Sequence, residues 1–149
     1  MVRRKTAPLK RQPKLAIEIH NTHATPIEFA TLRKITEKVW RSESTVDGKI
    51  SLVLGDDDLI KSLNRQYLGK NSLTDVIAFP LNEIESPVFE GEIYVSLDRV
   101  KANADYYDVN FDEELMRVTI HGLLHLLGYD DRTKVDKNVM KRREDFYLE

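Results

Sequence analysis

The segment from Val118 to Asp131 constrains the fold more than any other part of the chain. It is an apolar run interrupted by His121 and His125, and Gly128 follows shortly before its acidic end. Histidines four residues apart lie on one face of an α-helix, one turn apart. Glycine readily adopts the left-handed conformation that ends many helices, so Gly128 predicts a helix end. The segment therefore predicts a largely buried helix with two imidazoles on one face.

A shared metal ion explains two histidines in such apolar surroundings. An unpaired imidazole is costly to bury, and neutral imidazole nitrogens are good zinc ligands. The chain folding back after the helix brings an acid to the same ion, and the spacing favours Asp131, with Asp130 as the competing acid. The spacing matches the metzincin metal motif, in which the third ligand is a histidine. We therefore predict one ion per chain, zinc or else another divalent metal, held by His121, His125 and Asp131, with a position left for water as in catalytic sites.

The composition is that of one soluble globular domain. The chain has 149 residues, of which 41% are hydrophobic and 32% charged, and it can bury a single core. No apolar run approaches the roughly 20 residues that span a bilayer. The absence of cysteine excludes a disulfide framework, and we expect a cytoplasmic protein. We divide the chain into a basic N-terminal extension at residues 1–14, expected to be flexible, and a single metal-dependent hydrolase domain at residues 15–149.

Hydrophobic spacing and capping signals predict four strands and five helices. Strands are expected at 15–20, 49–54, 74–80 and 92–96, with a turn at Asp47-Gly48 and a loop at 82–90. Helices are expected after caps at Thr25, Asp56, Ser96, Asn110 and Thr133. The first helix should run from Pro26 to about Arg41. This order predicts an α+β fold with a mixed four-stranded sheet, about five helices and a zincin-like central metal-binding helix.

The predicted metal helix resembles the motif of the YbeY family, bacterial metal-dependent endoribonucleases that act in ribosomal RNA maturation. That motif reads His-Gly-x-x-His-x-x-Gly-Tyr-Asp-His, and the chain matches it from His121 to Asp130. Further matching segments are Leu63-Asn64, Tyr67, Gly69-Lys70, residues 74–80 and Gly91-Glu92-Ile93. The resemblance covers residues 50–144. It implies a single-strand-specific endoribonuclease that acts in ribosomal RNA maturation and ribosome quality control, with ribosomal RNA and the small ribosomal subunit as partners.

Two departures from the family pattern bear on the site. Asp131 stands where the family has its third histidine, which changes the charge of the site. Leu68 stands where many members have an arginine after the tyrosine. The resemblance leaves Arg65 and Glu92 as candidates for catalysis, and Arg65 and Lys70 as candidates for contact with RNA phosphates.

Two other functions compete with RNA hydrolysis. The metzincin-like spacing suggests a metallopeptidase, but such peptidases place a glutamate directly after the first histidine as general base. Gly122 occupies that position and can neither accept nor donate a proton. The missing arginine leaves a second alternative, a non-catalytic ribosome-associated factor with a structural metal. The sequence favours the endoribonuclease.

Overall fold

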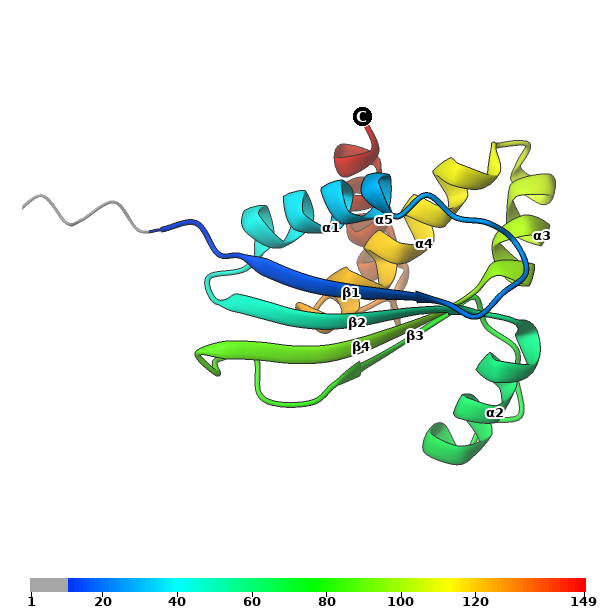
Figure 1. Cartoon of the computed structure of the whole chain (residues 1–149), viewed down its shortest axis with the longest axis horizontal. Coiled ribbons are helices and arrows are strands. Elements are labelled where there is room, and N and C mark those ends of the chain that lie inside the picture. The colour runs from blue at the N-terminus through cyan, green and yellow to red at the C-terminus, as the bar shows by residue number, and fades with distance from the viewer. Residues whose placement is uncertain (1–10) are drawn as a thin grey trace, which may run out of the picture.

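The computed structural model describes residues 11–149, so most of the basic extension lies outside the described residues. The strands are β1 (Leu15–Asn21), β2 (Asp47–Gly55), β3 (Val76–Pro80) and β4 (Val88–Ser96). The helices are α1 (Phe29–Glu43), α2 (Asp57–Leu68), α3 (Leu97–Tyr107), α4 (Phe111–Leu126) and α5 (Lys134–Leu148). The sheet order is β1-β2-β4-β3, with β3 antiparallel to β4 and the other pairs parallel (Figure 1). The predicted α+β fold with a mixed four-stranded sheet is confirmed.

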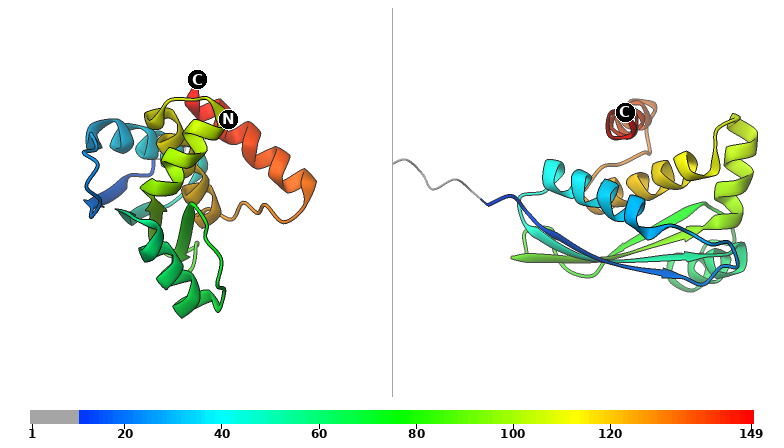
Figure 2. Two further views of the ribbon diagram at one scale, coloured as in Figure 1. Left: turned by 90° about the vertical axis from the view of Figure 1, so that its right-hand side faces the viewer. Right: turned by 45° about the horizontal axis from the view of Figure 1, so that its top comes forward.

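The helices divide between the two sides of the sheet. α1 and α4 pack on one face, and α5 crosses them on the side away from the sheet (Figure 2). α2 lies on the opposite side and contacts β3 and β4. α4 contacts β3 and β4 as well as α1, α3 and α5, so it is the central helix of the fold. Among the described helices, none combines the length and apolar character that crossing a membrane requires.

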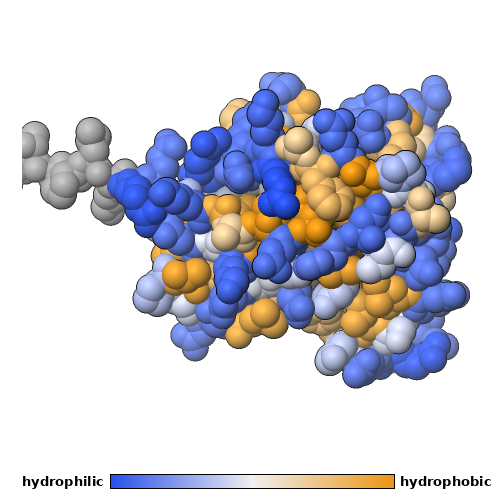
Figure 3. All heavy atoms as spheres, in the orientation of Figure 1, coloured by the Kyte–Doolittle hydropathy of each residue, from blue (hydrophilic) through white to orange (hydrophobic). Residues whose placement is uncertain are grey.

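The core lies between the sheet and the helices α1 and α4. In β1 the side chains of Leu15, Ile17 and Ile19 are buried and those between them are exposed, which is the alternation of a half-buried strand. Ile27 and Phe29 pack against the edge of this core. Apolar side chains accordingly gather between α1 and the sheet, while hydrophilic side chains cover most of the face in Figure 3.

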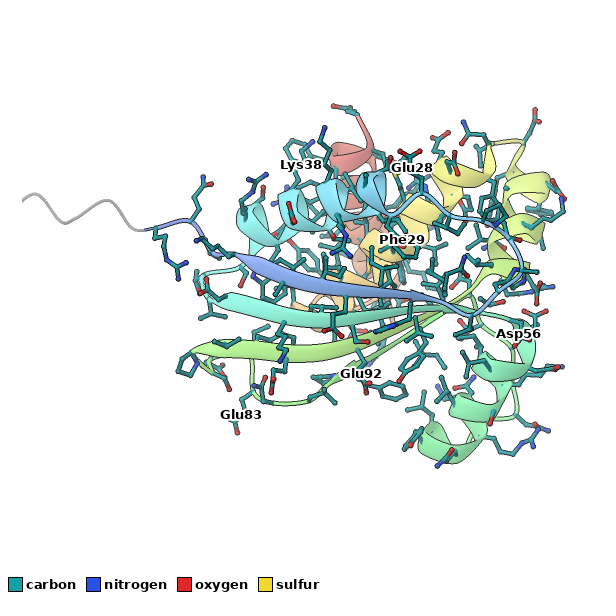
Figure 4. All side chains as sticks on the ribbon, viewed as in Figure 1. Glu28, Phe29, Lys38, Asp56, Glu83 and Glu92 are labelled. Atoms are coloured by element: carbon teal, nitrogen blue, oxygen red, sulfur yellow. The ribbon has the colours of Figure 1, made fainter. Side chains whose placement is uncertain are left out.

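The predicted start of the first helix is wrong. α1 begins at Phe29 (Figure 4). Its N-cap residue Glu28 makes no side-chain capping bond. The reason is that Thr25 belongs to the preceding loop. The amide of Asn21 donates to the carbonyl of Thr25 at 2.7 Å, and the N–H of Thr25 donates to Nδ1 of His23 at 3.1 Å. The helix therefore starts only after this loop has closed.

The predicted turn at Asp47-Gly48 and part of the predicted loop at 82–90 are also wrong. Asp47 and Gly48 begin β2, and they pair with Val88 and Phe89 of β4. The amide of Asn82 supports the early part of β4, because it donates to the carbonyl of Val88 and accepts from the N–H of Glu90. Long-range pairing with β2 thus extends β4 beyond its strongest local signal.

The other capping predictions are confirmed. The side chains of Asp56, Ser96 and Asn110 each accept a hydrogen bond from a backbone N–H in the first turn of α2, α3 and α4. Thr133 forms a reciprocal capping box with Asp136 at the start of α5. These local signals fix where the helices around the site begin.

Candidate metal centre

Gly122 brings α4 unusually close to the sheet. A Cβ atom at this position would lie 2.9 Å from Cγ2 of both Ile93 in β4 and Val76 in β3. The neighbouring His121 is therefore carried on a helix that packs directly on the two strands. The same contact leaves no room for a glutamate side chain after the first histidine, so the packing explains the glycine.

The end of α4 turns the chain back toward the two histidines. Gly128 has φ +99°, a conformation that other residues rarely adopt. Its N–H donates to the carbonyl of His125 at 3.1 Å, and the N–H of Tyr129 donates to the carbonyl of Leu124 at 3.0 Å. The helix therefore ends at the predicted glycine, and the chain reverses there.

A buried acid at the end of α1 anchors the loop that carries Asp131. Both oxygens of Glu43 accept hydrogen bonds, from the hydroxyl of Tyr129 at 3.0 Å and from that of Tyr147 at 2.7 Å. Nε of Arg143 pairs with the same carboxylate at 3.2 Å. Burial and the bond to Glu43 raise the pKa of Tyr147 to about 12. α1, the loop and α5 are thus held together beside the site.

The three predicted ligands come together at the end of α4. Nε2 of His125 lies 3.1 Å from Nε2 of His121, and Oδ2 of Asp131 lies 3.3 and 3.4 Å from the nitrogens of His121 and His125. Ligands of a tetrahedral ion with bonds of about 2.0–2.1 Å stand about 3.3–3.4 Å apart. The triangle thus has the size of one face of a zinc tetrahedron. No other group of three such side chains gathers in this way within residues 11–149.

Asp130, the competing acid, does not join this triangle. Its Oδ1 accepts the N–H of Asp131 at 2.8 Å, and its Oδ2 pairs with Nε of Arg132 at 3.2 Å. Asp130 therefore stabilises the turn, and Asp131 is the acid directed at the histidines.

Glu144 of α5 orients the first histidine. Its Oε2 lies 2.8 Å from Nδ1 of His121, and its Oε1 accepts from the guanidinium of Arg117 at 3.2 Å. A carboxylate on Nδ1 favours a proton there, which leaves the lone pair of Nε2 free for an ion. Sequence reasoning missed Glu144. Met140, Glu144 and Tyr147 are the buried residues of α5, and this burial becomes evident only once α5 packs on α4.

The electrostatics at His121 favour a positive charge. Burial lowers the pKa of this histidine, but the hydrogen bond and charge of Glu144, together with the charges of Asp75 and Asp131, raise it more. The net direction of the pKa shift is upward. A bound cation would receive the same stabilisation from these three carboxylates.

Two recesses are lined by different members of the ligand group. A groove of about 590 Å³ is lined by His125, Leu68 and Lys70, together with residues of β3. A second cavity of about 550 Å³ is lined by His121 and Asp131 and by residues of α3, α4 and α5. An extended substrate therefore has space beside both histidines of the ligand triangle.

The candidates from the sequence take different places around this site. Lys70 lines the groove on the side of His125. Arg65 is exposed in the last turn of α2 and is not among the residues that line the groove.

Glu92 lies on the other face of the sheet. Its neighbours Gly91 and Ile93 face Leu126 and Gly122 of α4, and side chains alternate along a strand. Glu92 therefore points away from the metal helix, and its Oε2 accepts a hydrogen bond from Tyr94 at 3.1 Å (Figure 4). Its candidacy for catalysis therefore rests on the family resemblance alone.

Comparison with known proteins identifies the family. The family described as Endoribonuclease YbeY matches residues 17–149. Endoribonuclease YbeY of Chlorobium phaeovibrioides is 39% identical over 134 residues, covering 90% of this chain and 89% of its own length. The homologue from Flavobacterium psychrophilum is 42% identical over 104 residues, covering 70% of this chain and 73% of its own length.

A solved structure agrees with these relatives. The solution structure of the protein TM1509 from Thermotoga maritima has a TM-score of 0.64 and is 33% identical, covering 89% of this chain and 86% of its own. The family match over residues 17–149 includes the whole of the central helix α4. The chain belongs to the YbeY endoribonuclease family, whose members are metal-dependent hydrolases of RNA phosphodiester bonds.

Proposed function

We propose that this protein is a zinc-dependent endoribonuclease that cleaves single-stranded segments of ribosomal RNA, with His121, His125 and Asp131 as the zinc ligands. The observation that carries this proposal is the triangle of two imidazole nitrogens and one carboxylate oxygen, with edges of 3.1–3.4 Å. The two recesses leave the triangle accessible to substrate.

The donor set supports zinc as the ion. Two neutral imidazoles and one carboxylate are typical of catalytic zinc sites, whereas magnesium and calcium prefer oxygen ligands alone. A zinc ion at this place would supply Lewis-acid activation of the phosphodiester and of water. Glu144 would hold His121 in the tautomer that binding requires.

The groove beside His125 suits the sugar–phosphate backbone of RNA. Lys70 lines it next to Leu68, the position at which many family members carry an arginine. The N–H of Lys70 donates to the carbonyl of Asn64 at 3.1 Å, and Gly69 ends α2 with φ +62°. This helix end fixes the backbone of Lys70, whose ammonium would pair with a phosphate on the way to the ion. Arg65 remains the alternative cation, at the exposed end of α2.

The two competing functions have less support. Gly122 packs against Ile93 and Val76, so α4 cannot carry the glutamate base of a metzincin-like peptidase at that position. A non-catalytic factor with a structural metal would be expected to close its site with a fourth protein ligand. The small ribosomal subunit as partner, a role in ribosome quality control and a cytoplasmic location follow from the proposed ribosomal substrate.

Cleavage of an end-labelled, unstructured RNA oligonucleotide tests the proposal. The zinc-loaded protein should cut it, and both chelator treatment and His125→Ala should reduce the rate by at least about a hundredfold, because the metal site is lost. His20→Ala is the matched control, since that side chain lies on β1 and is 55% exposed. Cleavage that survives in metal-free protein or in His125→Ala would contradict the mechanism. An uncut RNA with zinc bound would favour the non-catalytic factor.

A further inference from the structure

The cavity on the side of His121 contains polar side chains that metal binding does not use. It lies between α3, α4 and α5, and it reaches the metal ligands His121 and Asp131. The groove containing Lys70 reaches the ligands at His125 instead. A substrate held at the three ligands would have the groove beside His125 and this cavity beside His121 and Asp131. Its volume of about 550 Å³ is sufficient for a small organic ligand.

The wall of the cavity contains a buried acid with spare hydrogen-bonding capacity. Glu114 is only 5% exposed and lines the cavity. Burial raises the pKa of its carboxyl group, and the neighbouring amide of Asn103 offsets this only in part. That amide also donates to Asp75 at 3.1 Å. A carboxylate has about four acceptor positions, so one shared amide does not saturate Glu114, which lines the cavity.

The nearest cation does not satisfy Glu114. Arg117 follows it by three residues on α4, but its guanidinium donates to Glu144 at 3.2 Å and to Asp145 at 2.7 Å. The acids of the cavity do not form a second metal site either, because the one ligand group among the described residues is His121, His125 and Asp131. The charge of Arg117 lowers the pKa of Glu114, but its guanidinium bonds go to Glu144 and Asp145, so a ligand with N–H donors would find free acceptors on Glu114.

We propose that this cavity binds the nucleobase next to the scissile phosphate and selects guanine, with Glu114 accepting from its Watson–Crick edge. Guanine presents two adjacent donors there, N1–H and the N2 amino group, which match the two oxygens of a carboxylate. Uracil presents one N–H between two carbonyl oxygens, and those oxygens would face the carboxylate. The inference rests on the proposed cleavage of RNA.

The rim of the cavity offers contacts for the rest of a nucleotide. Tyr107 of α3 lines it and is 64% exposed, so its ring is available for stacking with a base. Lys137 and Lys141 of α5 line it as well, and they lie one helical turn apart on the same face. Their ammonium groups suit the next phosphate of the chain. An acceptor in the wall and cations at the rim match the polarity of a nucleoside monophosphate.

Calorimetric titration of the zinc-loaded protein with guanosine and uridine 5′-monophosphate tests this inference without any catalytic step. We expect guanosine monophosphate to bind at least about tenfold more tightly. Glu114→Gln replaces one acceptor with a donor, so affinity for guanosine monophosphate should fall about tenfold while that for uridine monophosphate holds or rises. If Glu114 had only a structural role, its replacement would lower the affinities for both nucleotides together. Glu83→Gln, at an exposed position in the β3–β4 connection, is the control.

Two exposed variants keep the test informative if Glu114→Gln fails to fold. Tyr107→Ala should weaken both nucleotides by the same several-fold factor, and Lys137→Ala should do so in a salt-dependent manner. Equal affinity of the wild-type protein for the two nucleotides, or an unchanged ratio in Glu114→Gln, would overturn the inference. RNA cleavage without any guanine preference would overturn it while the proposed function stands. Selective binding of guanosine monophosphate without RNA cleavage would overturn the proposed function while this inference about the cavity stands.

Discussion

At the scale of single residues, the ability of His121 to bind a metal depends on Glu144, which contacts the other nitrogen of its ring. Nδ1 of this histidine is 2.8 Å from Glu144, a carboxylate that is 6% exposed. The charge of that carboxylate makes Nε2 a stronger ligand, and its position fixes the ring. Because Glu144 also pairs with Arg117 of α4, the histidine is part of a set of contacts that joins α5 to α4.

Removal of the charge on Glu144 should weaken metal binding. Glu144→Gln keeps the shape of the side chain, and we expect the affinity for zinc to fall about 10- to 100-fold. Competition with a chromophoric chelator measures this affinity. Asp145→Asn is the matched control, because Asp145 contacts the same Arg117 at 2.7 Å and is half exposed. Equal zinc affinity in the two variants would show that Glu144 does not support the ligand.

The third ligand of the site could be predicted from the sequence, whereas the residue behind His121 could not. Spacing after Gly128 was sufficient to favour Asp131, because a helix and its end are local features. Glu144 was not predicted, since its contact with His121 joins residues 23 positions apart on different helices. Its buried position between Met140 and Tyr147 becomes clear only when α5 is placed on α4.

At the scale of elements, the position of α4 on the sheet determines where the histidines lie. Gly122 allows the helix to contact Ile93 and Val76 closely, and a Cβ atom would stand 2.9 Å from a methyl group of each. The helix therefore has to shift or the strands have to give way if a side chain is added there. Both responses move the imidazoles relative to Asp131.

Gly122→Ala should therefore destabilise the protein although alanine favours helix. The gain in helix propensity is about 1 kcal/mol, and overpacking costs about 1–3 kcal/mol. We expect a net loss of up to about 2 kcal/mol in urea unfolding, and weaker zinc binding. Adding Val76→Ala removes one of the two methyl contacts and should recover part of the loss in a double-mutant cycle. A Gly122→Ala variant that shows the full gain of about 1 kcal/mol expected from helix propensity would contradict this packing.

The element boundaries that were predicted correctly have local causes. Asp56, Ser96, Asn110 and Thr133 cap their helices through bonds within one turn. The boundaries that were wrong have distant causes. Asn21 and His23 draw Thr25 into a loop, and β2 extends β4 back to Val88. Neither contact has a signal at the position where the prediction failed.

At the scale of the whole molecule, the site is built where three segments of the chain meet. α4 supplies the histidines, the loop after it supplies Asp131, and α5 supplies Glu144. Glu43 of α1 binds Tyr129 and Tyr147 and so holds the loop and α5 together. The fold class could be predicted from the order of elements. The face of the sheet on which Glu92 lies could not be predicted from the sequence, because this face depends on how α4 packs against β4.

The metal content of the purified protein tests the central claim most directly. Elemental analysis of protein produced without added metal should find about one zinc ion per chain. Asp131→Ala should lose most of this zinc, because one of three ligands is gone, and Asp130→Ala should keep it, because Asp130 contacts Arg132 and the backbone of Asp131. A wild-type protein without zinc, or the same zinc content in Asp131→Ala and Asp130→Ala, would contradict the site described above.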